Sequence, residues 1–328
     1  MLIPSIVLII ADIALIAGNL VALGSGFELL TGVSWVWFIL PVAVALWYIT
    51  VYSSFDLIKK VFLVMSMAFV TYIITAIFSH ANWGTILVRT FVPQVNFNFA
   101  EISAAVALLG ATISPYSMFW QVQEEKEQKR VGTPKQRMRS TILDVASGVI
   151  GGNLVSYFII ITTAATLFTH HQSIQTATDA ARSLEPLVGP FAKYLFAVGL
   201  IGSGLISIPV LLASTSYSIT GTFGWPAGLS KKPWQSEGFY LILTAALVAS
   251  LALALLRFNP IQLIFCANIL VGILAPILVV YVIMVANNRK IMRNQPVGIL
   301  TNFFLVLTAV ILVAAAILFF YGLATGQG

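Results

Sequence analysis

GATISPYSMFWQVQEE, residues 110–125, places a proline among hydroxyl and aromatic side chains within a strongly apolar chain. Pro115 lies in the middle of a run, roughly 100–122, that is long enough to cross a bilayer as a helix. A proline inside a helix removes one backbone hydrogen bond and clashes with the preceding turn, at a cost of about 3 kcal/mol. The stretch therefore predicts a membrane helix that is interrupted near its centre.

The composition leaves the membrane as the only class that fits. The chain has 328 residues, of which 59% are hydrophobic and 9% are charged. Its mean hydropathy of +0.98 lies far outside the range of soluble domains. The formal charge of +6 belongs to loops between apolar runs, so we expect the lipid bilayer, and no nucleic acid, as its partner.

Apolar runs of about 20 residues predict an all-α polytopic membrane protein with nine transmembrane helices. Helices are favoured over strands because the alternating ten-residue pattern of membrane strands is absent. The nine predicted spans are roughly 3–24, 33–52, 60–79, 100–122, 141–168, 189–219, 239–256, 260–286 and 297–323.

The distribution of basic residues supports these spans and predicts their orientation. Positive side chains are enriched in cytoplasmic loops, so correct spans should sort them onto alternate loops. One side receives Arg89, Arg182, Lys193 and Arg257, and the N-terminal side receives the remainder of the 17 lysines and arginines. We therefore expect an inner-membrane, multi-pass protein with a cytoplasmic N-terminus and an external C-terminus.

Two interpretations of the interrupted span remain open. Thr112, Ser114 and Ser117 flank Pro115 closely enough to satisfy the carbonyls that the proline frees, which would make the feature a simple kink. Alternatively, the span is a discontinuous helix at the bilayer midplane, whose unwound carbonyls and helix ends coordinate a cation, as in many secondary transporters.

The residues around the break also resemble a known family. LLGATISPYSMFWQVQEE, residues 108–125, resembles the sixth helix of the natural resistance-associated macrophage protein (Nramp) family of divalent metal transporters, in a bacterial branch with Ser-Pro-Tyr at the break. Residues 178–219 and 258–278 are similar to the loop with the eighth helix and to the tenth helix of that family. The resemblance implies a leucine-transporter-like bundle built from inverted repeats.

By this resemblance, residues 1–328 form a single transmembrane domain that corresponds to family helices three to eleven. The family's first helix carries an Asp-Pro break whose aspartate binds the metal, and no matching motif occurs in this sequence. We expect a truncated or late-started product of a longer gene, a product that has lost the transport core, or half of a split protein. An N-terminal segment that supplies two helices is accordingly an expected partner.

The resemblance implies a metal site at the break. The ligands would be the Ala111 carbonyl, Ser114 in place of the family's methionine, and Asn268, which could equally bridge two helices by its amide. A hydroxyl is a harder ligand than a thioether, so the expected ion belongs to the manganese, iron and magnesium class, with the harder ions favoured. The ion is substrate, and no resident cofactor is expected. Further residues expected along the path are Thr112, Pro115, Tyr116, Ser117 and Gln121.

Proton coupling is expected to be weak or absent. By the resemblance, the family's acidic residues of the third helix fall on Gly18 and Val21. Asp12, the acid within the first predicted span, is the possible replacement relay or cation-attracting group, because ionisable residues in spans are usually functional. It could equally lie near a helix end, paired to a neighbour or wetted from the cytoplasm.

Other functions were weighed against metal transport. A transporter of amino acids or other organic solutes would share the fold, and a non-transporting remnant or subunit would also fit the expected loss of two helices. An enzyme is not expected, because the spans contain no catalytic constellation. His170 and His171 are an adjacent pair without a third ligand, which is weak support for a metal site, and Cys266 in an apolar run is expected to be a buried hydrophobe.

Overall fold

The regular elements of the computed structural model are helices, as the sequence predicts. The structure describes residues 2–52, 67, 70–78, 82–92, 98–127, 132–166, 189, 192–292 and 297–325. Its helices are α1 (Leu2–Thr31), α2 (Val36–Tyr52), α4 (Val70–Phe78), α5 (Trp83–Phe91), α6 (Phe99–Thr112), α7 (Pro115–Glu127), α8 (Pro134–Thr166), α11 (Ala192–Phe223), the 3-10 helix η4 (Pro233–Gln235), α12 (Glu237–Leu255), α13 (Pro260–Asn287) and α14 (Ile299–Ala324).

Within these residues the predicted number of nine spans is not confirmed. Seven spans are long and apolar enough to cross a membrane, one of them made of α6 and α7 together, and α2 is apolar but shorter. Half of the predicted third span lies outside the described residues, and its end forms α4. The short helix α5 follows it in the predicted external connection and was not expected from the sequence.

Helix α8 begins at Pro134, seven residues earlier than the predicted start at 141. The basic residues between 134 and 141 were expected in a loop, and this expectation is wrong because they lie in the first turns of the helix. Thr133 and Gln136 explain the early start, because they form a reciprocal capping box. The Thr133 amide donates to Gln136 Oε1 at 2.9 Å, and the Gln136 amide donates to the Thr133 hydroxyl at 3.4 Å. The helical basic residues remain exposed to solvent: Lys135, Arg137 and Arg139.

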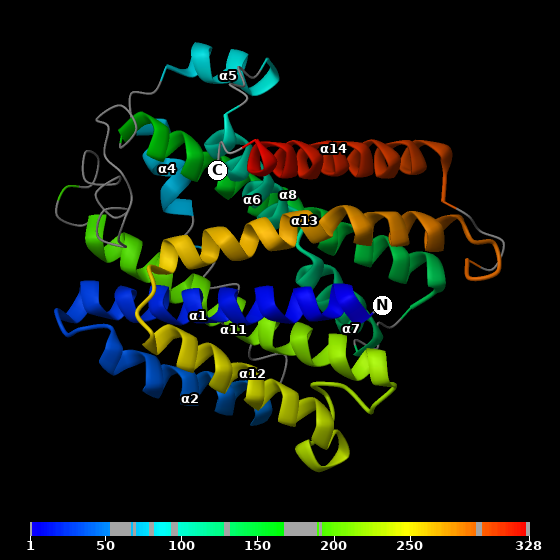
Figure 1. Ribbon diagram of the computed structural model, residues 1–328, viewed down its shortest axis with the longest axis horizontal. Coiled ribbons are helices and arrows are strands. Elements are labelled where there is room, and N and C mark those ends of the chain that lie inside the picture. The colour runs from blue at the N-terminus through cyan, green and yellow to red at the C-terminus, as the bar shows by residue number, and fades with distance from the viewer. Residues whose placement is uncertain are drawn as a thin grey trace.

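Helices α1 and α11 pack antiparallel at the centre of the bundle (Figure 1). Small residues allow the close approach, since a Cβ on Gly204 would meet the Leu23 side chain at 2.7 Å and one on Gly26 would meet Ile201 at 2.8 Å. At the other end of the pair, the hydroxyls of Ser5 and Thr222 lie 3.5 Å apart. This register places the middle of α1 against the middle of α11.

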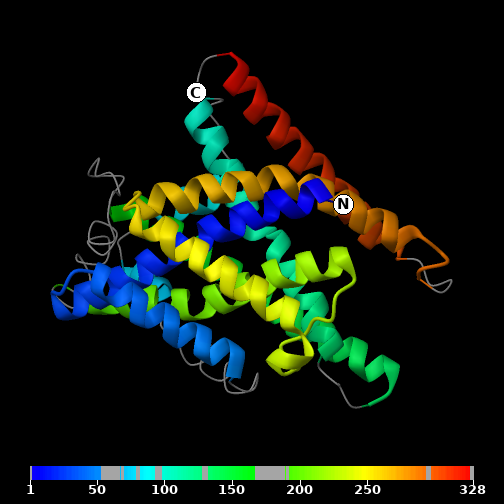
Figure 2. The same cartoon turned by 60° about the horizontal axis from the view of Figure 1, so that its bottom comes forward.

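The remaining helices surround this pair. Helices α2 and α12 lie on one side of it, and α13 packs along the other (Figure 1). Helix α14 leans out at the edge of the bundle, where only 11% of its apolar window is buried (Figure 2). An exposed apolar face of this kind suits lipid, whose tails are as apolar as the side chains themselves.

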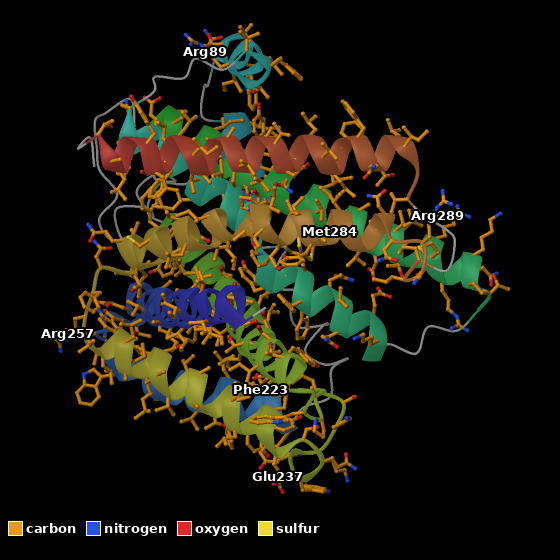
Figure 3. The ribbon with its side chains drawn as sticks, turned by 45° about the vertical axis from the view of Figure 1, so that its right-hand side comes forward. Arg89, Phe223, Glu237, Arg257, Met284 and Arg289 are labelled. Carbon is orange, nitrogen blue, oxygen red and sulfur yellow. The ribbon has the colours of Figure 1, made fainter. Side chains whose placement is uncertain are left out.

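Helix α13 spans the molecule from end to end. Arg257 and Arg289, which flank this helix, lie at opposite ends of the structure (Figure 3). This separation agrees with the sorting of basic residues onto two sides. Cys266 is exposed on α13, so the expectation of a buried thiol is wrong. A small apolar side chain loses little by facing lipid, and hydropathy therefore does not distinguish the two positions.

Candidate functional site

The predicted interruption is present between α6 and α7. Helix α6 ends at Thr112, and Ile113 leaves the helical region with φ −105° and ψ 59°. Helix α7 then begins at Pro115, where the missing N–H of a proline costs nothing. The proline also disfavours a helical conformation at Ser114, the residue before it. Local chemistry therefore explains why one span becomes two helices here.

Hydroxyl groups satisfy part of the interrupted backbone. The Ser114 hydroxyl donates to the Ala111 carbonyl at 2.7 Å, and the Ser117 hydroxyl donates to the Ser114 carbonyl at 2.7 Å. Thr112 donates to the Leu108 carbonyl one turn earlier, at 2.9 Å. The Ala111 carbonyl and the Ser114 hydroxyl each keep a lone pair that could face a cation. The patched kink and the cation-binding break are thus compatible in one geometry.

The residues at the break differ in exposure. Ser114 and Pro115 are buried, and Tyr116 is half-buried against the core formed by α1, α11, α12 and α13. Ala111, Thr112 and Ser117 are exposed. The break therefore has one face against the bundle and one open face, and its backbone oxygens lie between the two.

The neighbouring helix α13 brings Asn268 to the break. A Cβ on Gly110 would collide with the Asn268 carbonyl oxygen and would lie 2.5 Å from the Gly272 amide nitrogen. Gly272 in turn meets the backbone of α6 at Val106. The two backbones touch because both contact positions are glycines. Asn268, half-buried, therefore lies beside the last turn of α6 next to Ala111.

Gln121 is not drawn into this site. Its amide donates to Glu125 Oε1 at 3.4 Å, and the other oxygen of Glu125 accepts from Thr141 of α8 at 3.0 Å. Gln121 thus belongs to a polar connection between α7 and α8, about 9 Å along the helix from Pro115.

Asp12 is fully buried in α1 and lies opposite the centre of α11. Its Oδ2 accepts a hydrogen bond from the Thr215 hydroxyl at 3.0 Å, and the Ser214 hydroxyl also adjoins the carboxylate. Because Asp12 lies almost three turns inside α1, the interpretation as a wetted residue at a helix end is wrong. Tyr116 lies within electrostatic range of Asp12, which connects the break to this carboxylate.

The polar face of α11 was not expected from the sequence. Hydroxyl residues recur through STSYSIT, residues 214–220, inside a run of high hydropathy, and this recurrence was the available signal. Five of them are almost completely buried: Ser214, Thr215, Ser216, Ser218 and Thr220.

The positions at which the family's acids were expected serve packing. A Cβ on Gly18 would collide with the Ile264 side chain of α13, and Val21 is buried. Among the described residues, no three histidine, cysteine, aspartate or glutamate side chains gather as metal ligands. His170 and His171 lie outside the described residues.

The helices and the broken span define an integral membrane protein with an interrupted helix at which backbone and hydroxyl oxygens gather. The sequence model of the family described as natural resistance-associated macrophage protein-like (Nramp) matches residues 1–322. The chain belongs to the Nramp family.

The individual relatives share low sequence identity with this chain. The divalent metal cation transporters MntH of Caldanaerobacter subterraneus and Clostridium acetobutylicum are 20% identical over 216 residues and 23% identical over 236 residues. These matches cover 65% and 71% of this chain, and 49% and 51% of the relatives. The divalent metal cation transporter MntH of Erwinia tasmaniensis is 31% identical over 140 residues, which is 42% of this chain and 34% of that protein. The chain thus spans about half the length of the curated relatives it matches.

Proposed function

We propose that this chain is a transporter, not an enzyme, and moves divalent metal cations across a membrane by alternating access, with the ion passing the break between α6 and α7. Family membership and the names of the relatives support the substrate class. The observation that carries the proposal is the interruption at Ile113 and Ser114, which frees the Ala111 carbonyl from the helical pattern and brings the Ser114 hydroxyl to it next to α13. The divalent ion is the substrate, and the lipid bilayer is the medium in which the protein works.

The proposed ligands are oxygen atoms from two helices. The Ala111 carbonyl and the Ser114 hydroxyl come from the break, and the Asn268 amide oxygen comes from the adjoining turn of α13. Thr112, Tyr116 and Ser117 would line the path beside them. Neutral oxygen ligands suit Mg²⁺ and Mn²⁺, which retain part of their water shell, better than softer ions such as Cd²⁺. Gln121 would act further along the path, if at all, because its amide is engaged with Glu125.

The same geometry supports a hinge. Helix α6 is held on α13 by backbone contact at Gly110 and Gly272, so it cannot tilt without opening that contact. Helix α7 lies beyond the non-helical Ile113 and packs on α11. We assign the conformational change of alternating access to rotation of α7 about Ile113 and Ser114, with α6 fixed.

The location and orientation complete the proposal. Basic residues at the α8 start and beyond α13 support a cytoplasmic location for these ends, with the N-terminus on the same side and the C-terminus outside, in an inner membrane. The described helices would correspond to helices three to eleven of a leucine-transporter-like bundle. Asp12 would attract the cation electrostatically or relay a proton. Coupling to protons is expected to be weak, since Gly18 and Val21 carry no charge.

Uptake by proteoliposomes tests the proposal. The purified chain should accumulate Mn²⁺ and Mg²⁺, and Ser114→Met should shift the initial-rate ratio of Cd²⁺ to Mg²⁺ upward by about tenfold, because a thioether prefers the softer ion. Ser147→Met on the exposed face of α8 is the matched control and should leave the ratio unchanged. An unaltered ratio in Ser114→Met would contradict the ligand assignment.

Two further outcomes separate the other functions. Uptake of amino acids without uptake of any divalent ion would support a transporter of organic solutes. Folded protein that moves neither class would contradict transport by this chain. A transmembrane pH gradient imposed on the same vesicles measures coupling, and acidification driven by metal entry would contradict the expected lack of coupling.

A further inference from the structure

Three buried polar atoms between α1 and α11 lack hydrogen-bond partners. They are Oδ1 of Asp12 and the hydroxyl oxygens of Ser214 and Ser218. All three residues are at most 3% exposed. Leaving a polar atom unpaired in such surroundings destabilises the fold, and a charged atom does so more strongly than a neutral one. Orphaned oxygens that converge on one helix interface point to a ligand that supplies positive charge.

The three oxygens share one interface. Thr215 fixes Asp12 Oδ2 at 3.0 Å, which holds the carboxylate against α11 at the position of Ser214. Ser214 and Ser218 are four residues apart, so they project from the same face of α11, one turn from each other. The free Oδ1 and the two unpartnered hydroxyls therefore lie along a single seam. The hydroxyls of Ser5 and Thr222 continue this seam to the end of the helix pair, where Thr222 is exposed.

The charge of the seam favours a monovalent ion. The basic residues of the helices that pack around Asp12 are Lys193 and Lys126, near the far ends of α11 and α7. Lys193 lies 22 residues before Thr215, about 33 Å along the helix axis. One carboxylate is neutralised by a single positive charge, whereas a divalent ion would leave an excess charge buried in the bundle.

The ligand chemistry favours a metal ion over a proton. A proton on Asp12 would neutralise the carboxylate, but it would leave at least one of the two serine hydroxyls without a partner. A cation uses oxygen lone pairs from all of these groups at once, and carboxylate and hydroxyl oxygens are hard donors. Sodium is the small, hard, monovalent cation that is abundant outside cells.

We propose that Asp12, Ser214, Thr215 and Ser218 bind a sodium ion between α1 and α11, at a site separate from the break. The site deepens the cation-attracting role proposed above for Asp12. Tyr116 lies within electrostatic range of Asp12, so sodium at Asp12 would change the charge that faces the first turn of α7. Sodium binding would then stabilise one orientation of α7 relative to α11.

Thermal unfolding of the full chain in detergent tests the sodium site, with divalent ions removed by a chelator. Replacing choline chloride by sodium chloride at equal ionic strength should raise the midpoint by about 2 to 5 °C, because a ligand that binds only the folded state stabilises it. Asp12→Asn should abolish the increase. The double variant Ser214→Ala with Ser218→Ala should reduce the increase by more than half. Because it keeps the Asp12 carboxylate, it tests the site even when Asp12→Asn does not fold.

The control uses the same helix and the same chemistry. Ser216 is fully buried, but its hydroxyl already donates to the Leu212 carbonyl at 2.9 Å. Ser216→Ala should therefore keep the full response to sodium. Direct binding of radioactive sodium to the purified protein should follow the same order among the variants.

Two results would overturn the site. The first is equal midpoints in sodium and choline chloride for the parent protein together with a higher midpoint for Asp12→Asn, which would mean that the carboxyl is protonated. The second is sodium binding that survives both Asp12→Asn and the double serine variant. Metal uptake is measured separately. A chain that binds sodium but does not transport Mn²⁺ would support this inference and contradict the proposed function. A chain that transports Mn²⁺ but does not bind sodium would support the proposed function and contradict this inference.

Discussion

Single side chains at the centre of this bundle are held by very few polar contacts. Asp12 is fully buried, yet among the described residues only the Thr215 hydroxyl donates a well-aligned hydrogen bond to its carboxylate. Burying a charge is tolerable only when nearby groups compensate for its lost hydration. The hydrogen bond from the Thr215 hydroxyl therefore has a structural role, and its removal should lower the stability of the folded protein measurably.

Replacing Thr215 by valine tests this dependence. Thr215→Val keeps the shape of the side chain but removes the donor to Asp12 Oδ2. We expect the free energy of unfolding to fall by about 1–3 kcal/mol, the cost of an unsatisfied buried group. Thermal unfolding in choline chloride measures it. Thr220→Val is the control, since the buried Thr220 hydroxyl donates only within its own helix, to Ser216 and Tyr217. Equal losses in the two variants would contradict a special role for Thr215.

At the scale of whole helices, the prolines of this chain differ in whether the helix continues past them. Pro41, Pro209 and Pro276 lie inside helices that continue past them, whereas Pro115 begins a new helix. One missing hydrogen bond can be absorbed as a bend. At Pro115, the Ser114 hydroxyl takes over the freed Ala111 carbonyl, so the chain can leave the helix altogether. A proline is thus insufficient for a break, and its polar neighbours decide the outcome.

Pro115→Ala should weaken transport without weakening the fold. The new amide could donate to the Ala111 carbonyl four residues earlier and so compete with Ser114 for a proposed ligand. We expect Mn²⁺ uptake to fall by at least about tenfold, since small displacements of a binding group are costly. The midpoint of thermal unfolding should stay the same or rise. Pro41→Ala, in the exposed part of α2, should leave uptake unchanged. Normal uptake by Pro115→Ala would contradict a functional break.

The contact between α6 and α13 gives a prediction about packing. Gly110→Ala would place a methyl group against the Asn268 carbonyl, and neither backbone can yield without separating the helices. We expect a loss of roughly 3 kcal/mol or more, or no folded protein. Gly148→Ala in α8 is the matched control, because nothing lies within 4 Å of the added methyl group. It should be neutral or stabilising by up to about 1 kcal/mol. Monodisperse yield and thermal unfolding compare the two.

For the molecule as a whole, the distribution of charge predicts its orientation. The two ends of α13 carry Arg257 and Arg289 on opposite sides of the structure (Figure 3). In a Cys266→Ser background, Arg257→Cys should react with a membrane-impermeant maleimide in intact cells. Arg289→Cys should react only after the membrane is opened. The reverse pattern would invert the proposed orientation, and labelling of both from one side would contradict α13 as a span.

The sequence by itself determined the class of the protein and the place of its broken helix. Hydropathy identifies membrane helices as the building elements because lipid permits little else, and Ser114 with Pro115 interrupts a helix through local sterics and a local hydrogen bond. It did not determine which polar groups meet. The start of α8, the exposure of Cys266, and the approach of Asp12 to Ser214 and Thr215 depend on how the helices rotate and slide against one another. Only the tertiary structure decides that, because glycine contacts set the register of α1 on α11 and of α6 on α13, across intervals of sequence that no local pattern encodes.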